Sequence, residues 1–340
     1  MSRVLPIVLS SVCLALACSP APPGPWTVAS TEAIVADHVV AADLDGDGVV
    51  ELGTVRGGTL EIGGHSIDLP GAFQRAVRLD KSGGDTLVVA SGQGRGHREA
   101  PAVLTQLTAD GHQQVWTYQG DRNQVTDLRA VNGRIWLTAY TDARKVGGGW
   151  LDDGAFDPLT VSHMGQRQLP LADGRVVVAR VYGEAPKSPG DLQLHTPGQP
   201  ASPLASLRGA RALAAVDLDG DGVDEVISGD GWHFAYGREG DPRVVVHSGP
   251  ELAESRVIGW VPGSYAALDI LPIGTGLQAA LLVQGSRRVV LLQRDALGWG
   301  VLDLGEISEV GDVAVYEAED GLKVAISGDG ARVLTLQRAP

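Results

Sequence analysis

Two short acidic segments have the residue types and spacing best suited to binding a metal ion. Asp43–Glu51 reads DLDGDGVVE and Asp217–Glu225 reads DLDGDGVDE, so both carry carboxylates at positions 1, 3, 5 and 9. A hard cation such as Ca²⁺ takes roughly six to eight oxygen ligands from carboxylates, carbonyls and water. A tight loop can direct alternate side chains at one centre, and the glycines permit the sharp turns that this requires. The pattern predicts two structural calcium sites.

The ligands follow from this spacing. The first predicted site uses the side chains of Asp43, Asp45, Asp47 and Glu51 and the carbonyl of Val49. The second uses the side chains of Asp217, Asp219, Asp221 and Glu225 and the carbonyl of Val223. Asp224 is expected to point away. Without a cation, repulsion among four carboxylates would disfavour a compact loop, which favours metal binding over a simple turn.

An EF-hand or a dockerin is the alternative for this pattern, and two features argue against it. An EF-hand loop needs an acidic residue at position 12 and a helix after it. Position 12 is Thr54 in the first segment and Ser228 in the second, and β-rich sequence follows both. The acidic segments Asp80–Asp85 and Glu317–Gly321 and the single Asp269 are interpreted as turns, because their spacing does not complete a ligand set.

The sequence shows no catalytic constellation. The eight histidines are scattered without a zinc-binding spacing, and no Gly-x-Ser-x-Gly motif occurs. His38 precedes the first acidic segment and is expected at a surface strand end. The only cysteines, Cys13 and Cys18, lie near the N-terminus, so no cysteine nucleophile or disulfide is expected in the folded domain.

Short apolar runs recur along the chain and would position the acidic segments. They are rich in Val, Ile, Leu and Thr and are separated by Gly, Asp and Pro, which indicates an all-β fold. The most apolar run of each unit is Val50–Thr54, Thr86–Ala90, Arg134–Ala139, Arg175–Arg180, Glu225–Ser228, Leu277–Val283 and Leu322–Ser327. Their spacing of roughly 36 to 55 residues lies in the range of propeller blades.

A repeated pentapeptide supports these units. Ile227–Gly231 and Ile326–Gly330 both read ISGDG, and Ala90–Gly94 is a near copy. An apolar run follows each copy, as at Trp232–Tyr236, which predicts a strand, a glycine-containing turn and a second strand. A small sheet of this kind has an unburied face, and stacking the units in a ring would bury it.

The strand–loop–strand setting of the two acidic segments resembles the FG-GAP repeats of integrin α-subunit propellers and their bacterial relatives. This resemblance implies a calcium-binding β-propeller with four-stranded blades and the acidic loops in blades one and five. Seven blades are preferred, with six or eight left open. Trp26–Ala29 is expected to close the ring by pairing with the last blade, Asp312–Gln337.

Two stretches make the spacing of the apolar runs irregular in blades three and four. Thr141–Pro158 and Gly183–Ser202 are rich in Gly, Asp and Pro, so both are interpreted as loop insertions and candidate contact loops. On this interpretation, deleting Lys187–Gln199 would leave folding and calcium binding intact and abolish a partner interaction.

The N-terminus predicts export. Residues 1–17 have a basic start and an apolar run too short to span a bilayer, as in a signal peptide. Ala15–Cys18 resembles the lipobox of bacterial lipoproteins, with Ala15 where leucine is usual, which implies lipidation of Cys18. Residues 18–25 are Pro-rich and predict a tether, and residues 26–340 a single propeller. The resemblance favours the cell envelope, at the outer membrane or cell surface, with the lipid as the only membrane contact.

Charge narrows the class of partner. The formal net charge is −14, which argues against nucleic acid and anionic lipid, since both need Lys/Arg patches. The leading hypothesis is a monomeric, non-catalytic binding or scaffold module for a protein or glycan. One alternative is a polysaccharide lyase or hydrolase, which would need carboxylates in a central channel that are not calcium ligands. The other is a lipoprotein scaffold for outer-membrane assembly, which rests on fold-level analogy alone.

Overall fold

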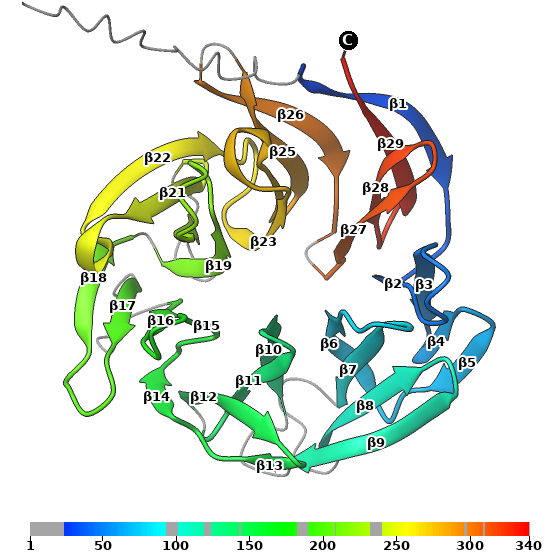
Figure 1. The fold of residues 1–340 in the computed structure, drawn as a ribbon, viewed down its shortest axis with the longest axis horizontal. Coiled ribbons are helices and arrows are strands. Elements are labelled where there is room, and N and C mark those ends of the chain that lie inside the picture. Colours follow the sequence, from blue (N-terminus) through cyan, green and yellow to red (C-terminus); the bar gives the residue numbers. More distant parts are fainter. Residues whose placement is uncertain are drawn as a thin grey trace, which may run out of the picture.

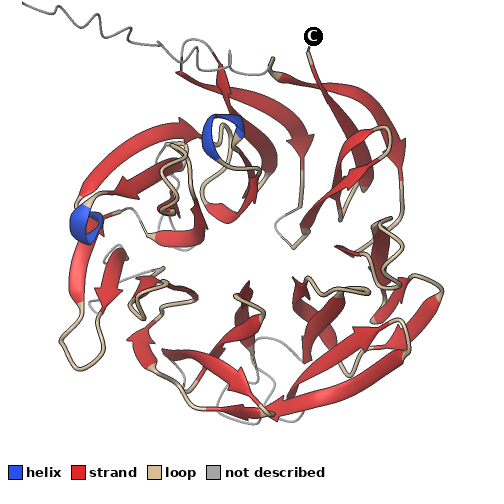
Figure 2. Ribbon diagram, in the orientation of Figure 1, coloured by secondary structure: helices blue, strands red, loops and turns tan. Residues whose placement is uncertain are grey.

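The computed structural model describes residues 24–92, 101–118, 124–142, 144–181, 190–207, 209–231, 240–295, 298–308 and 310–339. The predicted signal peptide, Cys18 and the run Trp232–Tyr236 lie outside these ranges. Within them the fold consists of strands and two short 3₁₀ helices, η2 (Pro250–Leu252) and η3 (Gly276–Gln278) (Figure 2). Neither helix, nor any other stretch of the described chain, forms an apolar helix of membrane-spanning length.

The strands form seven antiparallel sheets around a central axis (Figure 1). Blade 1 contains β2 (His38–Ala42), β3 (Glu51–Arg56), β4 (Thr59–Ile62) and β5 (His65–Asp68). Blade 2 contains β6 (Ala72–Leu79), β7 (Thr86–Gly92), β8 (Ala102–Thr108) and β9 (Gly111–Tyr118). Blade 3 contains β10 (Val125–Val131), β11 (Arg134–Tyr140), β12 (Lys145–Asp152), β13 (Ala155–Phe156) and β14 (Thr160–His163). In blade 3 the outermost strand is split, because β13 and β14 pair with opposite ends of β12.

The remaining blades follow the same order from the centre outward. Blade 4 contains β15 (Arg167–Pro170), β16 (Val176–Ala179), β17 (Asp191–His195) and β18 (Ser202–Ser206). Blade 5 contains β19 (Ala210–Val216), β20 (Glu225–Asp230), β21 (Arg243–Ser248) and β22 (Glu254–Trp260). Blade 6 contains β23 (Ala267–Ile273), β24 (Ala280–Gly285), β25 (Arg288–Asp295) and β26 (Gly298–Glu306). Blade 7 contains β27 (Val313–Ala318), β28 (Gly321–Ile326), β29 (Arg332–Arg338) and β1 (Trp26–Ala33). The preferred seven-bladed propeller is confirmed.

Ring closure is confirmed as well. The N-terminal strand β1 pairs antiparallel with the C-terminal strand β29, from Trp26 opposite Arg338 to Ala33 opposite Arg332 (Figure 1). Trp26 packs against the apolar cluster between blades 6 and 7, and the Arg338 guanidinium lies 4.4 Å from the centre of its ring. The two ends of the chain therefore complete one sheet.

Each of the seven recurring apolar runs predicted from the sequence overlaps the second strand of its blade. These strands are β3, β7, β11, β16, β20, β24 and β28. These strands lie between two partners, and their faces pack against neighbouring blades. All residues of β7, β20 and β24 are buried. A strand buried on both faces has no polar side to alternate with, so it is the most apolar run of its unit.

The apolar core is divided among the interfaces between blades. A large cluster joins blades 5 and 6, and others join blades 1 and 2, 4 and 5, and 6 and 7. The contact between blades 3 and 4 is smaller, with Trp136 packed on Val176 and Val178. Here Gln168 is fully buried, and its side chain donates to the carbonyls of Val146 and Gly165 at 3.4 and 3.3 Å. A polar residue in this interface helps to explain why the repeat is faint in these blades.

The interpretation of Thr141–Pro158 as a loop insertion is wrong. Most of it is strands β12 and β13, and Gly147–Gly149 lies inside β12 opposite Leu137–Ala139. The glycines reflect close packing: a Cβ on Gly148 would lie 2.1 Å from Oε1 of Gln168. A run of glycines in a sequence usually indicates a loop. Here the glycines form a strand, because neighbouring residues already fill the space that their side chains would need.

The interpretation of Gly183–Ser202 needs the same correction. It contains β17, whose Leu192 and Leu194 are buried in the cluster between blades 4 and 5. Deleting Lys187–Gln199 would therefore remove the third strand of blade 4 and disrupt folding. Residues 182–189 lie outside the described ranges, so the structure does not assign a contact loop there.

Candidate functional site

The two acidic segments form the loops between the first and second strands of blades 1 and 5, as predicted. In the first loop, the Asp43 carboxylate accepts from the backbone N–H of Gly46 at 2.8 Å and of Gly48 at 3.0 Å. Oε2 of Glu51 accepts from the N–H of Leu44 at 3.0 Å. Gly46 has φ of +74°, a left-handed conformation that glycine adopts without strain. These bonds fold the loop back over its own first residue.

The second loop repeats this pattern with the same donors and acceptors. The Asp217 carboxylate accepts from Gly220 at 2.6 Å and Gly222 at 3.0 Å. Oε2 of Glu225 accepts from the N–H of Leu218 at 2.7 Å. Two segments nearly alike in sequence therefore adopt one conformation in different blades, so the conformation is a property of the local sequence.

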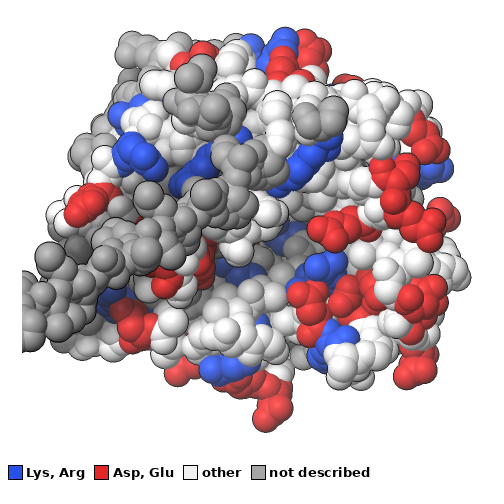
Figure 3. Space-filling view, turned by 45° about the horizontal axis from the view of Figure 1, so that its top comes forward, with Lys and Arg blue, Asp and Glu red and all other residues white. Residues whose placement is uncertain are grey.

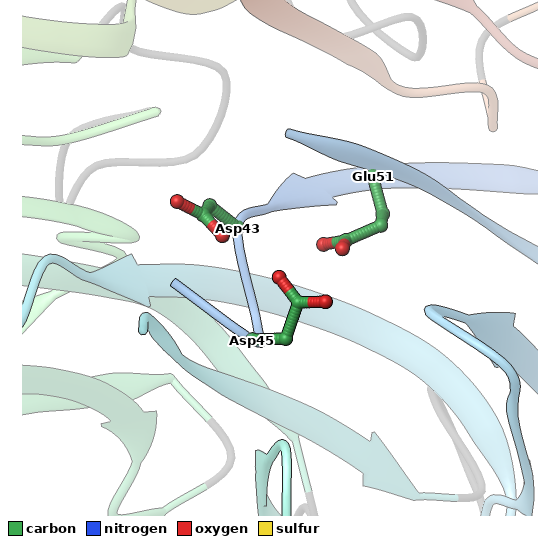
Figure 4. Close-up of side chains that lie close together, drawn as sticks. All are labelled: Asp43, Asp45 and Glu51. Atoms are coloured by element: carbon green, nitrogen blue, oxygen red, sulfur yellow. The ribbon is translucent and has the colours of Figure 1, made fainter. Parts of the chain in front are cut away.

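Each loop brings three carboxylates together. Ligand oxygens of Asp43, Asp45 and Glu51 all lie within 4.8 Å of one another, and the same holds for Asp217, Asp219 and Glu225. Figure 4 shows the first set, with the Asp45 and Glu51 carboxylates facing a shared space beside Asp43. Three oxygens at this separation can hold one metal ion, and carboxylates suit a hard cation.

The fifth and seventh positions stand apart from these clusters. Oδ1 of Asp47 accepts from the N–H of Val49 at 2.7 Å, and Oδ1 of Asp221 accepts from Val223 at 2.7 Å. Neither aspartate belongs to its three-carboxylate cluster. Metal ligation by these aspartates and by the carbonyls of Val49 and Val223 stays a prediction.

Burial and charge distinguish the ninth position of the second loop. Glu225 is buried, and burial raises the pKa of its carboxyl group above the ordinary value, with Asp219, Asp221 and Asp217 adding to the effect by repulsion. The bond from Leu218 acts in the opposite direction. A cation among these groups would offset both the burial of the Glu225 carboxylate and its repulsion by the three aspartates. These effects favour ion binding in this loop.

Both loops also contact the following blade. The carbonyl of Asp43 accepts from the N–H of Asp85 in blade 2 at 2.6 Å, and the carbonyl of Asp217 accepts from the N–H of Gly276 in blade 6 at 2.7 Å. Leu44 and Leu218 are buried in the apolar clusters at these two interfaces. An ion that orders the loop would therefore stabilise an interface between blades.

A cavity of about 1,070 Å³ occupies the central channel and is lined by the first strands of all seven blades. Most of its wall is apolar, including Val77, Leu128, Leu169, Ile270 and Val313. Acidic and basic side chains are visible around the hollow at the centre of the molecule (Figure 3). The channel is therefore a second candidate site.

Charged side chains from different blades meet where the first strands begin. The Asp127 carboxylate accepts from Arg129 at 2.8 Å and from Arg167 at 3.2 Å. Arg167 also lies 3.7 Å from Asp269, and Arg75 lies 3.9 Å from Asp269. Blades 2, 3, 4 and 6 are joined in this way.

Blades 7 and 1 extend the network. Oδ1 of Asp312 lies 3.6 Å from Arg75, and Oδ2 of Asp312 contacts Nδ1 of His38 at 2.5 Å. The His38 ring stacks on Phe73 with 4.6 Å between ring centres. His38 was expected at a surface strand end and Asp269 in a turn. His38 does begin strand β2, but it is half-buried in this network instead of lying at the surface. Asp269 lies within β23, so the interpretation of Asp269 as a turn is wrong.

Bulges near the start of several first strands help to build the network. The pairing shifts register between Val125 and Asp127 in β10 and between Ala267 and Asp269 in β23. The carbonyl of the skipped Thr126 accepts from Arg167 and, at 3.3 Å, from Arg75. The carbonyl of the skipped Leu268 accepts from Arg167 at 3.2 Å. A bulge frees a backbone carbonyl from the sheet and redirects the next side chain, here an aspartate.

Comparison with known proteins adds little to this description. No family model and no curated protein matches the chain. Among solved structures, the chain is similar to a candidate 6-phosphogluconolactonase from Bacteroides fragilis, with a TM-score of 0.46 and 12% sequence identity. The match covers 77% of this chain and 79% of that one. A likeness of this size transfers no function.

Proposed function

We propose that the chain is a calcium-stabilised β-propeller that serves as a non-catalytic binding or scaffold module for a protein or glycan. We further propose that a lipid on Cys18 holds it at a bacterial cell envelope. The observation that supports calcium is the match between the two loops, each with three converging carboxylates. At millimolar Ca²⁺ and a dissociation constant of about 10⁻⁴–10⁻³ M, each ion would contribute about 0.4–1.4 kcal/mol to stability.

Asp219→Ala is expected to lower the calcium stoichiometry by one ion per chain and to reduce thermal stability only when Ca²⁺ is present. Asp219 offers one of the converging carboxylates of the second loop. Calorimetric titration with Ca²⁺ measures the stoichiometry, and melting with and without chelator measures the stability. Asp224→Ala is the matched control, because it removes a carboxylate from the same loop but outside the cluster. An equal loss of stability in chelator would show that Asp219 is not a ligand.

The channel favours a second candidate function, a polysaccharide lyase or hydrolase. Asp127, Asp269 and Asp312 converge there and are not calcium ligands, which is the arrangement that an enzyme would need. The binding role is still preferred, because both oxygens of Asp127 are committed to Arg129 and Arg167. Within the described part of the chain, His247 contacts the hydroxyls of Ser228 and Ser255, but this histidine is fully buried and lies outside the cavity.

Incubation with neutral and acidic polysaccharides separates these two functions. We expect no new reducing ends and no unsaturated products above a protein-free control. Product formation that is abolished in Asp312→Asn would instead identify the channel carboxylates as catalytic and replace the binding role.

A further inference from the structure

The charged network in the channel leaves specific hydrogen-bonding capacity unused. Oδ1 of Asp269 accepts from the N–H of Ile270, but its Oδ2 lies 3.7 Å from Arg167 and 3.9 Å from Arg75, beyond hydrogen-bonding distance. Oδ1 of Asp312 is likewise 3.6 Å from Arg75. Among the described residues, Arg75 makes one hydrogen bond, from Nε to the carbonyl of Thr126. Two carboxylate oxygens and the terminal nitrogens of one guanidinium therefore converge without direct bonds.

These groups are also more exposed to the cavity than the bonded core of the network, Asp127 and Arg167. The side chains of Arg75, Asp269 and Asp312 are 28%, 26% and 18% exposed, whereas those of Asp127 and Arg167 are 8% and 5% exposed. Arg75, Asp269 and Asp312 all line the cavity. The inner part of the network is thus bonded and buried, and the part with spare capacity faces open space.

The charge balance selects the ligand class. The network has three arginines, Arg75, Arg129 and Arg167, and three aspartates, Asp127, Asp269 and Asp312, so its formal charge without His38 is zero. At the open face an anionic group would meet the carboxylates of Asp269 and Asp312, and a cationic group would meet the guanidinium of Arg75. A hydroxyl group is both a donor and an acceptor, so adjacent hydroxyls can donate to carboxylates and accept from a guanidinium together.

We propose that this end of the channel binds a neutral polyhydroxylated ligand, a saccharide unit, through Arg75, Asp269 and Asp312. The carboxylates accept from hydroxyls of the ligand and Arg75 donates to them. The Phe73 ring and the apolar wall contact its C–H groups. The cavity volume of about 1,070 Å³ exceeds that of a single sugar ring and admits a short oligosaccharide. This inference rests on the proposed binding role and narrows its partner to a glycan, while being independent of calcium.

Saturation-transfer NMR on the full chain tests the site. The probes are glucose, galactose, mannose, N-acetylglucosamine, inositol and neutral trisaccharides, with acetate and phosphate as anionic comparisons. We expect saturation transfer to at least one neutral probe, with and without Ca²⁺. Asp269→Asn should weaken that binding by about tenfold or more, because a hydrogen bond to a charged group is lost. Asp303→Asn in outer strand β26 of the same blade is the matched control and should bind normally.

Several results would overturn the site. These are no signal from any neutral probe, tighter binding of acetate or phosphate, or equal binding by the Asp269 and Asp303 variants. The first result would mean that water alone fills the gaps between the charged groups. If Asp269→Asn fails to fold, Arg75→Lys provides the same test, since it keeps the charge but loses the fork of donors.

The same samples separate this site from the proposed function. New sugar resonances that grow over a day only with protein present would contradict the non-catalytic role while supporting the site. Absence of saccharide binding with normal calcium stoichiometry would contradict the site alone.

Discussion

A chain that lacks residues 1–33, and therefore strand β1, is expected to lose on the order of 5 kcal/mol of unfolding free energy and to aggregate. The ladder between β1 and β29 provides several backbone hydrogen bonds, each worth about 0.5–1.5 kcal/mol net. Loss of Trp26 also uncovers the cluster between blades 6 and 7. The edge of β29 would then be open to pairing with another molecule. Denaturant unfolding and light scattering measure the two effects.

The control is a chain that lacks only residues 1–23, which keeps β1 and should match the full-length protein. A synthetic peptide of residues 24–36 added to the shorter chain should restore its stability, while a scrambled peptide should not. Unchanged unfolding midpoints in the shorter chain would show that the ring does not depend on this closure.

The second large effect is a loss of stability at acidic pH caused by one buried histidine. His247 on β21 is fully buried between Ser228 and Ser255, whose hydroxyls lie 2.8 and 2.9 Å from its two ring nitrogens. Burial lowers the pKa of His247 from 6.5 to about 4. Between these values the unfolded chain binds the proton and the folded chain does not, so acid favours unfolding. The contribution is complete above about pH 6.5, and about 3 kcal/mol is lost by about pH 4.

Denaturant unfolding across this pH range, compared between wild type and His247→Gln, isolates the effect. The variant keeps a polar side chain but cannot titrate, so its stability should fall less steeply as the pH is lowered, whatever its stability at neutral pH. His112→Gln, on the exposed part of β9, is the control and should follow the wild type. Parallel curves for wild type and His247→Gln would contradict the assignment.

The repeated pentapeptide shows how far local sequence reaches. Residues Ile227–Asp230 of the first ISGDG copy lie within β20, whereas only Ile326 of the second copy lies within β28, and its Gly328 has φ of +90°. Ser228 contacts His247 within blade 5, whereas Ser327 accepts from the N–H of Asp312 in blade 7. The same five residues therefore adopt different backbones in the two blades, and the neighbouring strands decide both where the strand ends and what the serine contacts.

The acidic loops and the second strands could be predicted because each depends on contiguous residues, and the closing strand because Trp26–Ala29 is left over before the first repeat. The loops close through bonds between residues no more than seven positions apart, and the second strands are apolar runs because both faces are buried. The two glycine-rich stretches misled because loops and tightly packed strands both favour glycine. Close packing in the folded chain distinguishes them: Gly148 lies against Gln168 in the first stretch, and Gly190 lies against the carbonyl of Arg180 in the second.

The channel network could not be predicted, because most of its blades contribute one residue each and no pair lies in a shared motif. His38 and Asp312 are 274 positions apart, and Arg167 lies 101 positions before Leu268, whose carbonyl it binds. A charged residue at the start of an apolar strand does not indicate which residue of another blade it will contact. The sequence by itself determined the repeat and the acidic loops, because those depend on neighbours along the chain, and the repeat in turn left one N-terminal segment to complete the last blade. Only the closed ring decided which lone charges meet at its axis, because that depends on the number and rotation of the blades.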